Sequence, residues 1–415
     1  MKAFPSTWRS YSPIQFFSFF VPLSLFSILA SSPCQAATYY VAANGTDNAP
    51  GTELQPLRNI AKGVSMLRAG DTLLIKQGTY AESINSNVLP IVRGSSWSTP
   101  VTIAAYPGHT VVLKPGPTGE VINLAQSSIQ YLVIDRLVID ATNAKFGVSI
   151  TNGARYIRIQ NSEVKNSRLS GILLSDRAGY NQLINLKVYS NGTNRYDHGI
   201  YIATSHNLVD GCEIYDNSAY GVHIYNSASG ERADNNVIQR SIIRNNGVRD
   251  ESSAGIILSS GEGNGAYNNI VRSNPHGISV NHRALNSKVY NNVIFGNGHN
   301  GIDVGSGSTG ALLKNNIVYK NGADIYNVGY ATGLANNLTR DPKFVDPAAG
   351  NFSLQATSPA IDAGITLIEV RDDFNGVPRP QGTAYDIGAY EFKFASPASV
   401  EPRAAGKREV EPKGY

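Results

Sequence analysis

Residues 199–224 read GIYIATSHNLVDGCEIYDNSAYGVHI, and this stretch contains one complete unit of a sequence repeat. The unit opens with a Gly and an apolar-x-apolar triplet, passes an apolar-x-x-Asn segment at Ile214–Asn217, and returns to the opening pattern at Gly221. Apolar residues that alternate with a period of two are typical of strands. The unit therefore predicts short strands separated by turns.

The same unit recurs between Phe146 and Asn321. Its glycines are 24, 28, 22, 34, 22 and 24 residues apart, at Gly147, Gly171, Gly199, Gly221, Gly255, Gly277 and Gly301. A regular period of this length indicates stacked units, none of which can bury its apolar face alone. The fold class that we expect is an all-β solenoid of short parallel strands.

Each unit of the repeat also contains one Asn, three residues after an apolar residue. The apolar-x-x-Asn segments end at Asn191, Asn217, Asn246, Asn274, Asn297 and Asn321. Asn tolerates left-handed backbone and can bond its neighbours through its amide, so stacked Asn residues predict an internal ladder.

The first 36 residues have the features of an export signal. Lys2 and Arg9 precede an apolar run, and small residues flank a cleavage position after Ala36. We therefore expect residues 1–36 to be a signal peptide and the mature chain to be secreted, with no membrane span. Cleavage would leave Cys212 as the one cysteine, with the parity of a core residue.

Composition excludes some partners. The chain carries a net charge of +4, and the signal segment contributes two positive charges, so the mature chain is near +2 (4 − 2). This charge does not indicate general nucleic-acid binding. We expect a monomer.

The segment before the repeat carries a family resemblance. Tyr40 to Asp47, Ala69 to Ile75 and Gly78 to Glu82 resemble the N-terminal module of secreted right-handed β-helix proteins, a group that includes pectate-lyase-like enzymes and alginate- or chondroitin-lyase relatives. The resemblance implies a right-handed, single-stranded parallel β-helix. Ile60 to Leu67, ended by Gly70, are expected to form the one short helix, as part of the N-terminal cap. The expected organisation is then a cap and first coils over 37–115 and repeats over 116–335.

The pattern changes from Asn336 onward. Segments such as Asp341-Pro342, Ser358 to Gly364 and Asp386 to Glu391 resemble the choice-of-anchor Q module of many secreted β-helix proteins. We therefore expect such a module over 336–395. Residues 396–415 are rich in Pro, Ala, Lys and Glu and are expected to be a disordered tail.

Candidate functional residues follow from the alternation. In each Gly-apolar-x-apolar triplet, x faces outward. Aligned on the glycines, these positions form a column, at Ser149, Leu173, Tyr201, His223, Ile257, Ser279 and Asp303. A second column, two residues on, contains Tyr225. Since adjacent coils stack about 4.8 Å apart, Tyr201, His223 and Tyr225 are expected to be neighbours.

Two longer turns frame this position. Residues 192–198 and 247–254 are inserted before Gly199 and Gly255, whereas the turn before Gly221 is short. We expect both loops on one corner, as the walls of a groove whose floor carries His223. The first loop supplies Arg195, Tyr196, Asp197 and His198, and the second supplies Arg249 and Asp250.

This set of residues suits proton abstraction beside a carboxylate. Lyases and C5-epimerases of uronate-containing polysaccharides need a base, a proton donor and a group that neutralises the carboxylate. We expect His223 as base, Tyr201 or Tyr225 as donor and His198 as helper. Arg195 or Arg249 would hold the carboxylate, with Tyr196 and Asp197 as further substrate contacts.

Other functions remain open. A glycoside hydrolase needs two carboxyl groups, which Asp197 and Asp250 could supply. A non-catalytic glycan-binding or surface protein would use the tyrosines alone. No cofactor is required; calcium remains possible, although the repeats show no cluster of carboxylates that would bind it.

Overall fold

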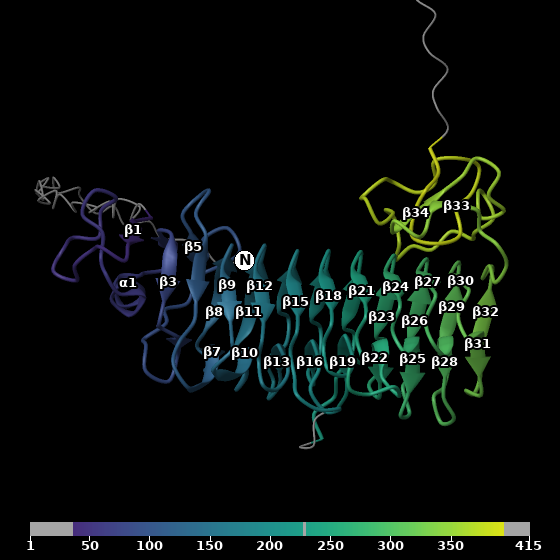
Figure 1. Cartoon of the computed structure of the whole chain (residues 1–415), viewed down its shortest axis with the longest axis horizontal. Coiled ribbons are helices and arrows are strands. Elements are labelled where there is room, and N and C mark those ends of the chain that lie inside the picture. Colours follow the sequence, from purple (N-terminus) through teal and green to yellow (C-terminus); the bar gives the residue numbers. More distant parts are fainter. Residues whose placement is uncertain (1–35, 227–229, 394–415) are drawn as a thin grey trace, which may run out of the picture. The chain divides into compact units, whose positions relative to one another are not determined.

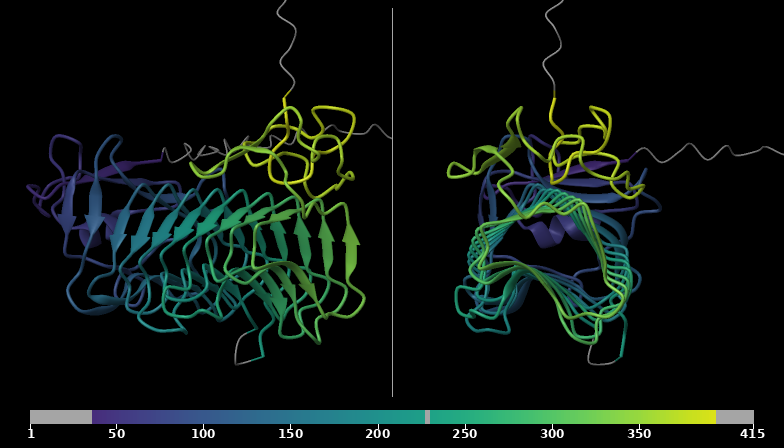
Figure 2. Two further views of the ribbon diagram at one scale, coloured as in Figure 1. Left: turned by 45° about the vertical axis from the view of Figure 1, so that its right-hand side comes forward. Right: turned by 90° about the vertical axis from the view of Figure 1, so that its right-hand side faces the viewer.

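The computed structural model describes residues 36–226 and 230–393, so the predicted signal peptide (up to residue 35) and the predicted tail (396–415) lie outside the described residues. Within them the chain is a parallel β-solenoid with a single short helix (Figure 1). Three long sheets run along the solenoid, and each coil in its middle part contributes one strand to each sheet (Figure 2). The predicted fold class is confirmed at this level.

The three sheets are named A, B and C here. Sheet A has twelve strands: β1 (Thr38–Val41), β2 (Thr72–Ile75), β5 (Val101–Ala105), β8 (Gln130–Asp135), β11 (Arg155–Gln160), β14 (Gln182–Ile184), β17 (Leu208–Asp210), β20 (Val237–Gln239), β23 (Gly265–Tyr267), β26 (Lys288–Tyr290), β29 (Leu312–Lys314) and β32 (Gly333–Ala335). Sheet B has ten: β3 (Gly78–Tyr80), β6 (Val111–Leu113), β9 (Val138–Asp140), β12 (Glu163–Lys165), β15 (Lys187–Tyr189), β18 (Glu213–Tyr215), β21 (Ile242–Arg244), β24 (Ile270–Arg272), β27 (Val293–Phe295) and β30 (Ile317–Tyr319). Sheet C also has ten: β4 (Ile84–Asn85), β7 (Thr118–Leu124), β10 (Ala144–Ile150), β13 (Ile172–Leu174), β16 (Ile200–Ile202), β19 (Val222–Ile224), β22 (Ala254–Ser259), β25 (His276–Asn281), β28 (Asn300–Val304) and β31 (Ala323–Asn327).

The apolar residues of the repeat triplets form the core of sheet C. Ile200 pairs with Val222 and Ile202 with Ile224, and all four side chains are fully buried. Burying one such side chain stabilises the fold by about 1.5–3 kcal/mol, and the sum over many coils holds the stack together. Cys212 is buried as a free thiol, as its parity predicts.

The predicted Asn ladder is present and explains the repeat glycines. The Asn191 amide donates to Oδ1 of Asn217 at 3.0 Å, and the chain of amides continues from coil to coil as far as Asn321. A Cβ on Gly199 would lie 2.8 Å from Nδ2 of Asn217 and 2.6 Å from the carbonyl oxygen of Gly221. Because no side chain fits beside the ladder, Gly and Asn recur together.

The backbone of the ladder differs from the expectation in one respect. The left-handed residue is the one before the ladder Asn, as at Ser190 and Asp216, with φ of 54° in both cases. Two further ladders, which the repeat pattern did not reveal, run through other turns: Asn181, Asn207, Asn236 and Asn264, and Asn269, Asn292, Asn316 and Asn337.

Near the N-terminal end, the single helix α1 (Ile60–Met66) lies where the sequence predicts a helix, one residue shorter than expected. Its first free amides, those of Ile60 and Ala61, donate to the carboxylate of Glu82 at 3.0 Å each. Such a carboxylate satisfies the open N–H groups of a helix start. A role for α1 in capping the first coil stays a prediction.

The segment after residue 336 folds back onto sheets A and B. It contains the antiparallel pair β33 (Phe344–Asp346) and β34 (Asn351–Leu354). Its apolar side chains pack on outward-facing residues of sheet B, and the combined cluster includes Ile270, Val293, Ile317, Phe344, Phe352 and Ile387.

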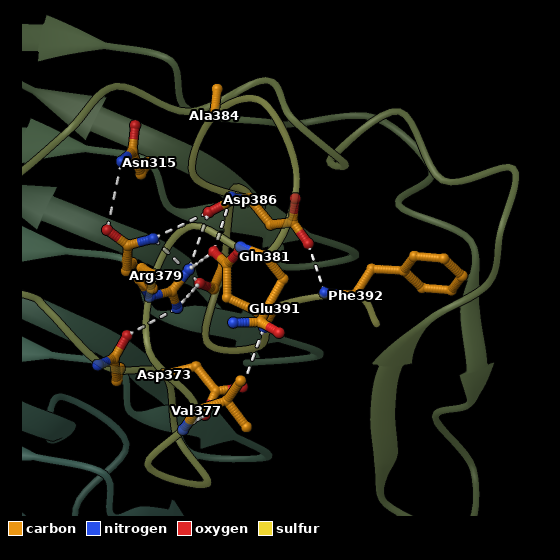
Figure 3. Close-up of polar contacts among 12 residues, drawn as sticks. Asn315, Asp373, Val377, Arg379, Gln381, Ala384, Asp386, Glu391 and Phe392 are labelled. Carbon is orange, nitrogen blue, oxygen red and sulfur yellow. Dashed lines mark hydrogen bonds and ion pairs between the residues drawn. The ribbon is translucent and has the colours of Figure 1, made fainter. Parts of the chain in front are cut away.

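A polar network completes this contact (Figure 3). The Arg379 guanidinium is fully buried and donates to Glu391, to Oδ1 of Asn268 at 3.0 Å and to the carbonyl of Gly388 at 2.9 Å. A buried pair of this kind requires satisfied hydrogen bonds on both partners, and both are supplied here. The identity of this segment as a choice-of-anchor Q module stays a prediction.

Among residues 36–226 and 230–393, no helix has the length and apolar character needed to cross a bilayer.

Candidate functional site

The outward face of sheet C gathers two imidazoles and three phenols around β16 and β19. Tyr201 and His223 are register partners on adjacent strands, and Tyr225 follows His223 by two residues. His198 and Tyr220 each precede a repeat glycine, so they occupy the same position at the start of neighbouring coils. These five residues are called the imidazole–phenol cluster below.

The rings of the cluster are in mutual contact. The His223 ring lies 4.6 Å from that of His198, 4.8 Å from that of Tyr220, 5.1 Å from that of Tyr201 and 5.7 Å from that of Tyr225, centroid to centroid. These distances are those of packed aromatic pairs. The predicted proximity of Tyr201, His223 and Tyr225 is confirmed.

The two imidazoles share a hydrogen bond. Nδ1 of His223 lies 2.9 Å from Nε2 of His198, and the direction of donation depends on the tautomer. His198 is only 5% exposed, and its Nδ1 is buried without a partner in the described part of the chain. His223 is partly exposed, and its Nε2 is directed away from this bond. The pair therefore holds the His223 ring in place and leaves its second nitrogen for another partner.

The surroundings set the charge of these rings. Burial lowers the pKa of His198 to about 4, with the nearby Asp250 acting in the opposite direction. Burial also lowers the pKa of His223 well below its ordinary value, and His198 and His282 add to this effect. Burial raises the pKa of Tyr201 and of Tyr220. At neutral pH the imidazoles of His198 and His223 are therefore neutral, and the phenols of Tyr201 and Tyr220 are protonated.

The two inserted loops lie on one corner, as predicted, on either side of the coil that carries Tyr220. The amide of Ala219 donates to the carbonyl of Asp197 at 3.0 Å, and the amide of Gly247 donates to the carbonyl of Ala219 at 2.7 Å. Asp250 in the second loop acts electrostatically on Arg195 in the first, as well as on His198 and Tyr220. Both loops thus border the cluster.

The side chains of the two loops differ in how accessible they are to a ligand. Tyr196 is 69% exposed, and its hydroxyl accepts a hydrogen bond from Nη2 of Arg195 at 2.7 Å. The Arg195 guanidinium also lies over the Tyr196 ring. The Arg249 side chain is exposed. These three side chains can reach a ligand above the cluster.

The sequence predicts a substrate contact for Asp197, but its side chain is buried within its own loop. It is 4% exposed, and its Oδ2 accepts hydrogen bonds from the amides of Thr193 and Asn194 at 2.8 and 3.1 Å. This geometry makes Asp197 a residue that shapes its loop, because an Asp carboxylate readily bonds nearby backbone amides in turns. The position of Asp197 therefore does not favour a direct contact with substrate.

The acids of the two loops, Asp197 and Asp250, both accept hydrogen bonds within their own loops. The Asp250 carboxylate accepts hydrogen bonds from Ser252 and Ser253, which help hold its pKa below the ordinary value despite partial burial. A hydrolase needs one carboxyl group that stays protonated, whereas the lowered pKa of Asp250 favours its ionised form.

Within residues 36–226 and 230–393, no three or more His, Cys, Asp or Glu side chains are grouped so that they could hold a metal ion.

Some sequence expectations about this face need correction, and some residues were missed. Ser149, Ile257 and Ser279 point outward in alternation but are buried, at 3–6% exposed. Ile257 is the register partner of His223, and the Ser279 hydroxyl donates to Asp303 at 3.2 Å. Tyr220 and His282 were not singled out, although the Tyr225 and His282 rings are 5.9 Å apart. The signal for Tyr220 was present, since it precedes Gly221 just as His198 precedes Gly199.

Residues 39–337 match a family model described as the Pel9A-like, right-handed β-helix region. This match covers more than half of the chain. The chain belongs to this family. The Pel9A-like family assignment also makes the solenoid a right-handed β-helix, as the resemblance in the sequence implied.

Relatives with curated names match over short stretches. The chain is 35% identical over 78 residues to pectate lyase PEL9 of Emericella nidulans, which is 19% of this chain and 18% of that protein. It is 24% identical over 136 residues to the uncharacterized protein YwoF of Bacillus subtilis, which is 30% of this chain and 28% of that protein. The matches thus span less than a third of these relatives' lengths.

Solved structures resemble the chain over most of its length. Pectate lyase Pel9A superposes with a TM-score of 0.69 at 19% identity, over 86% of this chain and 96% of that one. A rhamnogalacturonan lyase gives a TM-score of 0.58 at 16% identity, over 75% and 91%. At these identities the likeness concerns the fold.

Proposed function

We propose that this protein is a secreted enzyme that acts on an acidic polysaccharide, as a lyase or C5-epimerase, at the imidazole–phenol cluster. The observation that carries the proposal is the hydrogen-bonded pair of His223 and His198 in ring contact with Tyr201 and Tyr220. Membership of the Pel9A-like family supports a substrate of this class, since related lyases bear the names given above.

The cluster supplies the groups that removal of the C5 proton requires. A neutral imidazole accepts a proton, and its lowered pKa keeps His223 in that form at neutral pH. When Nδ1–H of His223 donates to Nε2 of His198, the other ring nitrogen of His223, its Nε2, carries a free lone pair and can act as the base. His198 thereby fixes the orientation and tautomer of the base.

The remaining requirements are a proton donor and an anchor for the carboxylate. Tyr201 and Tyr220 stay protonated because burial raises the pKa of each, and Tyr225 is exposed beside them. Arg195 and Arg249 lie on the bordering loops, where a guanidinium can pair with the carboxylate and so make the C5 proton more acidic. Calcium is not assigned a role, since the proposal needs no metal-bound step.

The test compares two histidine variants on a panel of uronate polymers. His223→Gln is expected to lower kcat by a factor of about 100 or more, because it removes the general base. His109→Gln is the matched control, since His109 accepts a hydrogen bond from the amide of Gln77 far along the solenoid and should leave turnover unchanged.

Formation of unsaturated uronate is followed by ultraviolet absorbance, and exchange at C5 by NMR. Turnover that survives His223→Gln contradicts the assignment of the base. Binding of these polymers without any turnover of them by the wild-type protein would instead favour a glycan-binding protein.

A further inference from the structure

A second group of aromatic side chains lies where the chain enters sheet A. Tyr131, Tyr156, Tyr180 and His206 occupy the same position in four successive coils and are called the aromatic column below. Neighbouring rings lie 5.0, 5.4 and 4.7 Å apart, centroid to centroid. Tyr180 and His206 are exposed, and Tyr131 and Tyr156 are partly exposed. The column is therefore a strip of phenols and one imidazole on the surface, separate from the imidazole–phenol cluster.

The backbone at this position does not explain why the residues are aromatic. All four have a positive φ, between 52° and 63°. In the next four coils the same position, again with a positive φ, is taken by Asn or Gly: Asn235, Gly263, Asn286 and Gly310. Asn and Gly adopt this left-handed conformation with the least strain. Four aromatic residues held there against their backbone preference point to a use for their side chains.

The later end of the column borders a shallow hollow. Its volume is about 290 Å³, and Tyr180 and His206 form part of its lining. Three arginines line it as well, namely Arg155, Arg177 and Arg232. The hollow thus combines aromatic and cationic side chains.

Two of these guanidinium groups are available to an anion. Arg232 already pairs with two carboxylates, at 2.8 and 3.1 Å. Arg155 and Arg177 are exposed, and neither forms an ion pair in the described part of the chain. The carboxylate in the lining, that of Glu231, accepts a hydrogen bond from the backbone amide of Arg177 at 2.8 Å. The Arg155 guanidinium lies 5.8 Å from the centroid of the Tyr156 ring, so it extends along the column.

We propose that the aromatic column, with Arg155 and Arg177, is a second binding site for an acidic polysaccharide, at which no bond is broken. A guanidinium pairs with a sugar carboxylate, and a phenolic hydroxyl bonds to a sugar hydroxyl. Because each coil contributes one ring, the site repeats along the solenoid, as a polymer repeats along its own length. The class of ligand rests on the proposed function.

The second site lies near the first. His206 follows Tyr201 of the cluster by five residues in the same coil, so their backbones are at most about 18 Å apart. A long polymer held at the column therefore has a raised local concentration at the cluster, with no new contact there.

The test measures binding in a variant that lacks the proposed base. Isothermal titration calorimetry of the full chain carrying His223→Gln gives the dissociation constants of polygalacturonate and of alginate. Adding Arg155→Gln and Arg177→Gln together should raise the constant by a factor of about 5 to 30 at low salt, the range for two exposed ion pairs. This difference should disappear at about 1 M salt, where exposed charges are screened. Tyr180→Phe should raise the constant by a factor of about 2 to 10, because it removes one hydroxyl and keeps the ring.

Arg340→Gln is the matched control, since Arg340 is exposed beyond β32, the last strand of sheet A, and should leave the constant unchanged. Equal binding by the double arginine variant and its parent overturns the inference, as does failure of the parent to bind either polymer. Equal weakening by Arg340→Gln also overturns it, because the whole surface would then attract the polymer. Weakening that persists at high salt, together with a lower free energy of unfolding in urea, assigns the two arginines a structural role and overturns it too.

The proposed function is tested separately, by turnover in the protein that retains His223. Binding through the column without turnover of any uronate polymer keeps this inference and removes the proposed function. Turnover with binding that does not depend on the column keeps the proposed function and removes this inference.

Discussion

Replacement of His198 by Gln should change how the stability of the protein depends on pH. His198 is buried and bonded to His223, and the pKa of His198 is lowered from 6.5 to about 4. Gln retains an amide that can bond Nδ1 of His223 but does not titrate in this range. The substitution therefore removes one proton-binding group from both the folded and the unfolded chain.

The magnitude follows from the two pKa values. Below pH 6.5 the unfolded chain binds a proton at His198, whereas the folded chain binds one only near pH 4. The contribution of the neutral His198 ring to the free energy of unfolding is therefore fully present above pH 6.5 and is lost as the pH falls toward 4. A difference of 2.5 units (6.5 − 4) at 1.36 kcal/mol per unit corresponds to about 3 kcal/mol.

The assay is urea unfolding of the wild type and of His198→Gln at several pH values between 7 and 4, at constant ionic strength. We expect the free energy of unfolding of the wild type to fall by about 3 kcal/mol more than that of the variant over this range. Asp386, whose pKa is raised to about 6, titrates in both proteins and cancels in the difference. Parallel pH profiles would refute the reasoning, because they would mean that His198 is free to bind a proton in the folded state.

Three further predictions concern the substrate anchor, the ladder and the C-terminal segment. Arg249→Ala should raise KM for a uronate polymer by a factor of about 10 to 150, since a charge-assisted hydrogen bond contributes about 1.5–3 kcal/mol. Initial rates at low salt measure this, and an unchanged KM contradicts it. Asn246→Ala should destabilise the protein by about 2–4 kcal/mol, because it leaves the buried amide of Asn217 without its acceptor. Urea unfolding tests this, and a loss of stability below about 0.5 kcal/mol would be inconsistent with the role of the ladder. Arg379→Met should lower the free energy of unfolding by about 3–5 kcal/mol, because it leaves Glu391 buried and unpaired. Limited proteolysis of the variant should then cut within residues 340–393 first. Resistance to proteolysis equal to that of the wild type would show that the pair contributes little.

The fold was predictable because each coil repeats the same steric constraint. Gly199 and Asn217 recur together since the ladder amide occupies the space that a Cβ would fill, and this coupling is visible as a spacing in the sequence. The neighbours of His223 on adjacent strands followed from the same alignment. Turn positions were harder, because Tyr220 and His282 lie outside the alternating triplets on which the alignment was built.

The C-terminal contact was missed for a different reason. Outward positions of sheet B at Ile270, Val293 and Ile317 are apolar, which is unexpected for a surface in contact with water. The alternation rule gave only the direction of these side chains and not what covers them. Arg379 gave no signal at all, since its partner Asn268 is 111 residues away in sequence.

The way in which the segment after residue 336 folds back has a consequence for how the solenoid unfolds. Asn268, Asn291 and Asn315 lie on three successive coils, and each amide donates to a carbonyl of that segment, at 2.7, 3.0 and 2.7 Å. A stack of repeats normally frays from its free ends, one unit at a time. Here residues 365–386 hold three coils together, so the coils at this end of the solenoid can separate only after these hydrogen bonds break.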